Sequence, residues 1–130
     1  MAHANRPSED AADEMKVRLR TDLKSAMRTR TSLDVSVLRS LIAALDNAQA
    51  VPVGDQHARY VEYEFGDPSV EIPRLVLDAA DVEAVLEREA SEWSVAADRF
   101  EALGQSDKSA ELRKQATIVA RYLGNPRAAR

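Results

Sequence analysis

The 130-residue chain contains no cysteine, only four glycines and five prolines, and few aromatic residues. The absence of cysteine excludes disulfides, thiol catalysis and any zinc or iron–sulfur site with cysteine ligands. Glycine and proline dominate turns, so their scarcity argues against a loop-rich or all-β protein. Because aromatic residues make up only 5% of the chain, its core has to be built from aliphatic side chains.

Long apolar segments are also missing. No apolar run approaches the roughly 20 residues that cross a bilayer. Residues 1–10 contain no apolar stretch of the kind found in signal peptides. We therefore expect a cytoplasmic protein with no membrane partner.

Apolar residues recur at intervals of three and four in four segments, which predicts four helices. The predicted helices cover residues 12–29, 33–50, 78–103 and 106–123. The first two and the last two are separated by very short linkers, so each pair is expected to lie antiparallel. The predicted fold is all-α: a compact bundle of four helices arranged as two α-hairpins joined by a long irregular segment.

The remaining residues define the expected domain boundaries. Residues 1–11 are polar and without periodicity, and we expect a disordered tail there. Residues 12–124 form a single domain, interrupted by an irregular insert at 51–77 that holds three of the prolines. Residues 125–130 form a frayed C-terminus.

Signals for catalysis are nearly absent. The two histidines, His3 and His57, lie outside the predicted helices, and neither has a partner at metal-ligand spacing. No glycine-rich phosphate loop and no nucleophile motif is present. We therefore expect no catalytic residue, no metal and no cofactor.

One acidic residue interrupts an apolar helix face. Glu89 lies between Leu86 and Trp93 on the inward seam of the third predicted helix. A buried carboxylate needs a partner, and Arg39 on the second predicted helix is a candidate. The pattern predicts a structural ion pair between Arg39 and Glu89, with simple exposure at the edge of the seam as the alternative.

Basic residues concentrate near the N-terminus, although the formal net charge is −4. Residues 16–39 contain seven basic and two acidic residues, whereas residues 51–103 contain four basic and thirteen acidic ones. A row with a spacing of four follows the first predicted helix for about 18 Å; it consists of Lys16, Arg20, Lys24 and Arg28. Such a row can contact several phosphates of a nucleic acid. The alternatives are a solvated face and a face that packs on the acidic third helix.

Five short segments resemble, in order and spacing, the GatB/YqeY family, in particular its small stand-alone YqeY-like proteins. The matching part corresponds to the N-terminal helical domain of that family. The segments are residues 19–28 (LRTDLKSAMR), 37–48 (VLRSLIAALDNA), 81–89 (DVEAVLERE), 99–104 (RFEALG) and 120–123 (ARYL).

The resemblance implies an all-helical bundle related to a domain in the B subunit of the tRNA-dependent amidotransferase, where that domain is thought to contact tRNA. The family is often described as a carbon–nitrogen ligase with glutamine as amido-N-donor. No residue of this chain is suited to that chemistry, so intrinsic activity is not expected.

Two hypotheses of different classes follow. The first is a non-catalytic adaptor, accessory to tRNA-dependent amidotransferase or tRNA aminoacylation, that binds tRNA or a tRNA-processing protein through the first helix and Arg39. The second is a protein-interaction or dimerisation module without a nucleic-acid role, which uses Trp93 and residues 60–65 and forms a homodimer.

Overall fold

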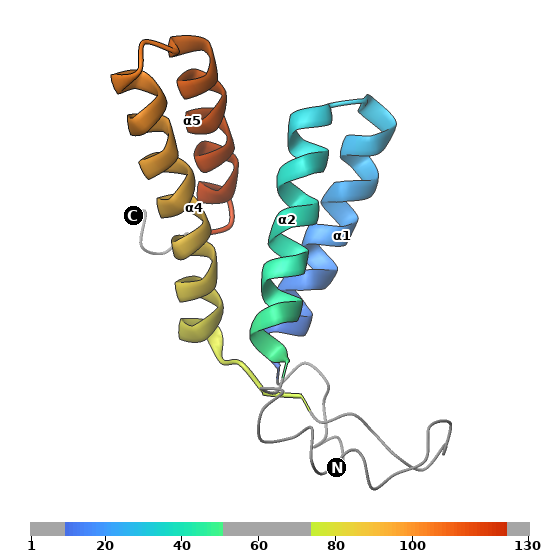
Figure 1. Ribbon diagram of the computed structural model, residues 1–130. Coiled ribbons are helices and arrows are strands. Elements are labelled where there is room, and N and C mark those ends of the chain that lie inside the picture. The colour runs from blue at the N-terminus through green and yellow to red at the C-terminus, as the bar shows by residue number, and fades with distance from the viewer. Residues whose placement is uncertain (1–9, 51–73, 125–130) are drawn as a thin grey trace, which may run out of the picture.

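A computed structural model describes residues 10–50 and 74–124 of the chain. Within these ranges the fold consists of four helices and no named strand (Figure 1); they are α1 (Ala11–Thr29), α2 (Ser32–Gln49), α4 (Ala79–Ala102) and α5 (Ser106–Ala120). The predicted all-α class is confirmed for the described part of the chain. Most of the predicted tail, most of the insert and the C-terminus lie outside it.

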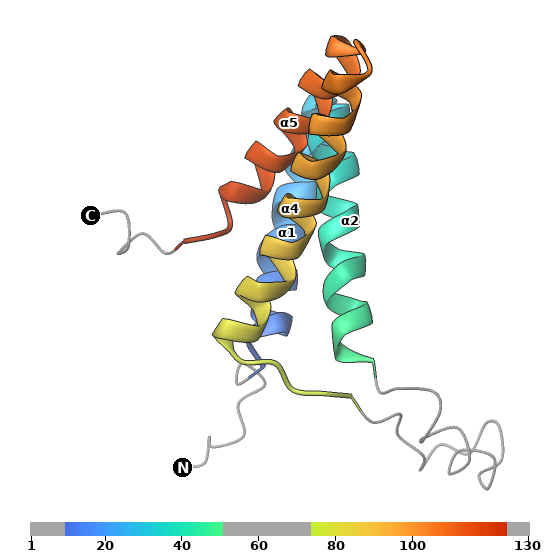
Figure 2. The ribbon, with the colours of Figure 1, turned by 60° about the vertical axis from the view of Figure 1, so that its left-hand side comes forward.

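The first two helices lie side by side and are connected by a tight turn (Figures 1 and 2). The helix α1 ends because Arg30 adopts a left-handed conformation, with φ 59° and ψ 40°. This reverses the chain and lets α2 begin at Ser32, after Thr31. The predicted boundaries of both helices are correct to within one residue.

The last two helices form the most extensive helix–helix contact of the described chain. A capping box starts α4, because the side chains of Asp78 and Asp81 each accept a hydrogen bond from the other residue's backbone N–H. The turn after α4 uses Gly104 at φ 80°. The helix α5 ends at Ala120, three residues before the predicted end, because Arg121 and Tyr122 form a turn.

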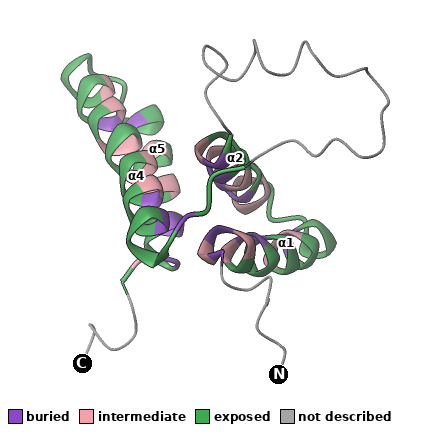
Figure 3. Ribbon diagram, turned by 90° about the horizontal axis from the view of Figure 1, so that it is seen from below, coloured by how far each residue is buried: buried purple, intermediate pink, exposed green. Residues whose placement is uncertain are grey.

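An aliphatic core joins the four helices. Its fully buried hydrophobic residues come from all of them, and α2, which contacts each of the other three, contributes most. They include Leu19, Val37, Leu38, Leu41, Leu45, Leu86 and Val119. Figure 3 shows the buried residues on the sides of the helices that face one another. The predicted aliphatic core is therefore confirmed, while Trp93 is half-buried and packs against its edge.

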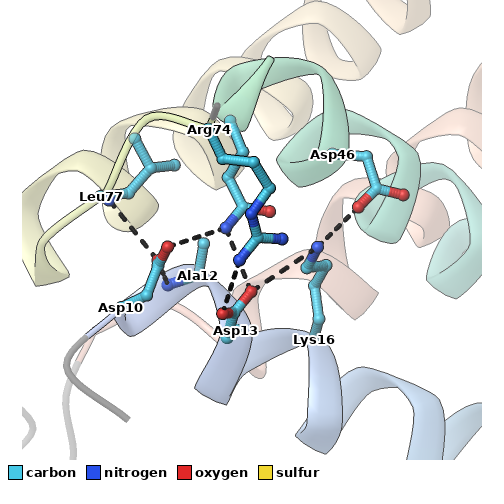
Figure 4. A network of polar contacts seen from close by, with 8 residues as sticks. Asp10, Ala12, Asp13, Lys16, Asp46, Arg74 and Leu77 are labelled. Atoms are coloured by element: carbon cyan, nitrogen blue, oxygen red, sulfur yellow. Dashed lines mark hydrogen bonds and ion pairs between the residues drawn. The ribbon is translucent and has the colours of Figure 1, made fainter. Parts of the chain in front are cut away.

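A polar network closes one end of the bundle (Figure 4). The carboxylate of Asp10 accepts hydrogen bonds from the Ala12 N–H at 2.9 Å and from the buried amide of Gln49 at 2.9 Å. Arg74 pairs with Asp13 at 3.0 Å, and the Leu75 N–H donates to the Gln49 carbonyl at 2.8 Å.

This network connects the start of α1, the end of α2 and the approach to α4. Asp10 and Ala11, which we assigned to the tail, therefore belong to the folded part of the protein. Residues 74–77, assigned to the insert, pack against the bundle through the buried side chain of Leu77. The hydrogen bond from Gln49 and the guanidinium of Arg74 lower the pKa of the Asp13 carboxyl.

Candidate nucleic-acid interface

The outward face of α1 is basic. Leu19 and Ala26 face the core, so the residues on the opposite side of the helix project into solvent. Among them are Arg20, Lys24 and Arg28, all exposed. No acidic side chain within the described ranges forms an ion pair with any of these three, so their charges remain available to an external anion.

Lys16, the first member of the predicted row, does not belong to this face. It is buried, and its Nζ lies 2.6 Å from an Asp46 carboxylate oxygen and 3.8 Å from one of Asp13. The end of α2 covers this part of α1 and supplies Asp46. The assignment of Lys16 as a nucleic-acid-binding residue is therefore wrong, and the exposed row from Arg20 to Arg28 is about 12 Å long.

Arg39 is exposed on the outward side of α2, but the ion pairs of the described residues do not include the predicted one between Arg39 and Glu89. Glu89 is half-buried instead, and desolvation together with the nearby Glu92 raises the pKa of its carboxyl, against a smaller opposite effect of Arg88. The alternative, a carboxylate at the edge of the seam, describes Glu89 better.

Two apolar residues accompany the basic ones on α1. Val17 is 61% exposed and Met27 is 50% exposed, and both count among the most exposed large hydrophobic residues of the described chain. A separation of seven residues places Val17 on the same side of the helix as Lys24, and Met27 on the same side as Arg20. The face therefore offers apolar contact next to positive charge.

A second polar group of residues lies where the end of α5 meets α1 and α2. The Tyr122 hydroxyl donates to Asp22 at 2.5 Å, and Arg121 pairs with Asp34 at 3.0 Å. The Arg18 guanidinium lies 4.7 Å from the centre of the Tyr122 ring. Burial and the Asp22 carboxylate raise the pKa of Tyr122 above its ordinary value of 10.0, so its hydroxyl keeps its proton and its hydrogen bond to Asp22 in alkaline as well as neutral solution.

These residues border a cleft of about 320 Å³ that is also lined by Ser25, Thr29 and Thr31. Both carboxylates in the cleft are already paired, Asp22 with Tyr122 and Asp34 with Arg121. The cleft therefore serves first as a junction that fixes the end of α5 to the other helix pair. We did not predict it, although Asp22 and Asp34 are the only acidic residues in the basic stretch 16–39.

The described residues provide no arrangement typical of a metal site: nowhere do three or more of their histidine and acidic side chains come together as ligands. His3 and His57 fall outside the described ranges, so the expectation that neither of them binds a metal stays a prediction. None of the described helices combines the length and apolarity needed to cross a bilayer.

Comparisons with known proteins add no assignment. The chain matches no family model, and comparison with curated proteins and with solved structures finds no significant match. The resemblance to the GatB/YqeY family therefore rests on the sequence segments alone.

Proposed function

We propose that the protein is a non-catalytic helical adaptor that binds RNA, with tRNA as the expected class, through the outward face of α1. The observation that supports this most is that Arg20, Lys24 and Arg28 are exposed on one face without an acidic partner in the described chain. Phosphates that replace bound counterions along this row supply a favourable, salt-dependent free energy of binding. The proposal also assigns Arg39, which is exposed on α2, to the residues that bind RNA.

The proposal also covers how the four helices pair and the family to which the domain is assigned. Two α-hairpins, α1–α2 and α4–α5, joined by the insert would form a GatB/YqeY-like domain of a cytoplasmic protein. Its role would be accessory to tRNA-dependent amidotransferase or tRNA aminoacylation, in contact with tRNA or a tRNA-processing protein. The five sequence segments support this assignment, as does the basic face of α1, which lies within the first of them.

The overall negative charge is consistent with such a site because the acidic residues lie elsewhere. Exposed carboxylates gather on α4 and at its start; they are Asp78, Asp81, Glu83, Glu87, Glu92, Asp98 and Glu101. An RNA is repelled by this helix and attracted by the outward face of α1. The uneven charge therefore orients the protein on RNA rather than preventing binding.

Charge reversal on α1 tests the proposal. The variant carries Arg20→Glu, Lys24→Glu and Arg28→Glu, and the control carries Arg88→Glu, Lys108→Glu and Lys114→Glu, all at exposed positions. Each substitution replaces +1 by −1, so both variants have a net charge of −10 instead of −4. Affinity for fluorescently labelled tRNA is measured by anisotropy over a series of salt concentrations.

We expect the natural protein to lose affinity with rising salt, with a slope of log K against log salt at least as steep as roughly −2 to −3, the value for the three phosphate contacts of Arg20, Lys24 and Arg28. The α1 variant should lose detectable binding at low ionic strength, and the control should keep most of it. Equal loss in both variants would indicate a general charge effect and reject α1 as the interface.

A protein partner is the second candidate, and the exposure of Val17 and Met27 favours it. We had assigned this role to Trp93 and residues 60–65, but Trp93 packs against the core and 60–65 lie outside the described ranges. In this case the partner, including a second copy in a homodimer, would cover the apolar part of the α1 face. Sedimentation velocity that shows a concentration-dependent mass, abolished by Val17→Ser with Met27→Ser, would support it.

A further inference from the structure

The turn between α1 and α2 holds a residue in an unfavourable conformation. Arg30 has φ 59° and is the only residue other than glycine with positive φ in the described chain. At this position after a helix, glycine is the usual residue because a side chain is strained there. The other two described residues with positive φ, Gly104 and Gly124, follow that rule.

The turn itself is tightly fixed. The Thr31 N–H donates to the Ala26 carbonyl at 3.0 Å, and the Arg30 N–H donates to the Met27 carbonyl at 3.3 Å. The hydroxyls of Thr29 and Thr31 lie 2.7 Å apart, and the Thr29 hydroxyl also reaches the Ser25 carbonyl at 3.1 Å. The backbone that carries Arg30 is therefore held in place by several hydrogen bonds at once.

The side chain of Arg30 contributes nothing to this network. Arg30 is exposed, and its guanidinium has no hydrogen-bond or ion-pair partner among the described residues. It lies two residues after Arg28, at the C-terminal end of α1 where the exposed basic row ends. The packing of the bundle thus gives no reason for an arginine at a position that favours glycine.

We infer that Arg30 is a phosphate-contacting residue that continues the basic face of α1 over the end of the α1–α2 turn. This inference rests on the proposed function, and it adds a residue that the sequence pattern did not indicate. The hydrogen-bonded turn fixes the backbone from which this side chain extends, so no backbone entropy is lost at this position when the guanidinium binds a phosphate. The strain in the backbone is the cost of this placement.

Three substitutions at position 30 separate charge from strain. Arg30→Gly removes both, Arg30→Ala removes the charge and keeps the strain, and Arg30→Lys keeps both. Each variant is melted by circular dichroism, and its affinity for labelled tRNA is measured as a function of salt. The variant Arg39→Ala serves as a comparison, because it shows how the loss of one exposed arginine on α2 changes the affinity for tRNA.

We expect Arg30→Gly to melt about 4 °C higher than the natural protein, because the strain is relieved. Its affinity should fall roughly threefold, with a slope of log K against log salt shallower by roughly 0.7 to 0.9, as for one lost phosphate contact. Arg30→Ala should show the same binding defect without the higher melting temperature, and Arg30→Lys should keep the natural slope.

If Arg30→Gly shows the same slope of log K against log salt as the natural protein, while the α1 charge-reversal variant loses binding, the inference is overturned and the proposed function stands. If Arg30→Gly and the α1 charge-reversal variant both bind tRNA with the affinity of the natural protein, the proposed function is rejected as well. A melting temperature for Arg30→Gly no higher than that of the natural protein would show that the backbone at Arg30 is not strained, and the inference would lose this premise.

Discussion

At the scale of single residues, Lys16 and Lys24 show how far a sequence pattern determines a role. Both are lysines of the same predicted row on α1, yet Lys16 is buried between two aspartates and Lys24 is exposed. A spacing of four advances by about 40° more than a full turn, so the row from Lys16 to Arg28 rotates about 120° around the helix. One end of it therefore faces α2 and the other faces solvent.

This difference gives a direct prediction for stability. Lys16→Glu places a third carboxylate beside Asp13 and Asp46 in a buried position, and we expect it to lower the free energy of unfolding by about 3 kcal/mol. Lys24→Glu, at an exposed site without a described partner, should change it by no more than about 0.5 kcal/mol. Urea denaturation measures both; equal effects would contradict the placement of Lys16.

A second prediction concerns Glu89. Because desolvation and Glu92 raise its pKa, the native state holds a proton more tightly than the unfolded state does. Stability contributed by this group therefore falls as the pH rises from about its ordinary pKa of 4.5 through the raised value in the folded protein. Glu89→Gln should melt higher than the natural protein at pH 7 and equally at pH 4.

The control for Glu89→Gln is Glu87→Gln, at an exposed position of the same helix. It should leave the melting temperature unchanged at both pH values. A lower melting temperature of Glu89→Gln at pH 7 would show that the carboxylate has a favourable partner after all, as we first expected for Arg39.

At the scale of helices, sequence patterns were most reliable for position and least reliable for ends that depend on distant residues. The ends of α1 and α2 were predicted to within one residue. The error at the N-terminus concerns Asp10, which falls in the predicted tail because its buried partner is Gln49, 39 residues further along the chain. The end of α5 is shortened at Tyr122, whose hydroxyl bonds to Asp22 across 100 residues.

The start of α1 supplies the prediction at this scale. Asp10→Ala removes the side-chain cap of Ala12 and leaves the buried amide of Gln49 with one acceptor fewer. We expect a loss of about 2 kcal/mol in the free energy of unfolding. The matched variant Glu14→Ala, exposed in the first turn of the same helix, should lose no more than about 0.5 kcal/mol. Equal free energies of unfolding for Asp10→Ala and Glu14→Ala would contradict the placement of Asp10 in the folded part of the protein.

At the scale of the whole molecule, periodicity was sufficient to predict an all-α fold with an aliphatic core. Apolar residues spaced by three and four mark the inward side of each helix, and Leu41 and Leu45 of α2 are fully buried as that pattern requires. Periodicity does not tell which charged side chains of different helices meet. The pairs Lys16–Asp46 and Arg121–Asp34 and the lack of one between Arg39 and Glu89 depend on how helices are oriented around their axes.

The functional proposal belongs to this scale as well, because it depends on the separation of charge between α1 and α4. The spacing in the sequence places Arg20, Lys24 and Arg28 in one basic row, and the structure shows these three exposed, whereas Arg30 could be recognised only from its backbone conformation. A basic face on one helix and acidic residues on another make the molecule electrostatically two-sided. Such a distribution favours one orientation on a polyanion.

Chemical-shift mapping tests this central claim most directly. A short RNA hairpin is titrated into the ¹⁵N-labelled protein at low ionic strength, and the backbone amide signals are followed residue by residue. We predict that the shifts concentrate on residues 17–31 of α1 and the following turn, while the amides of the acidic side of α4 remain unchanged. Shifts confined to α4 and α5, or no shift at all, would contradict the account.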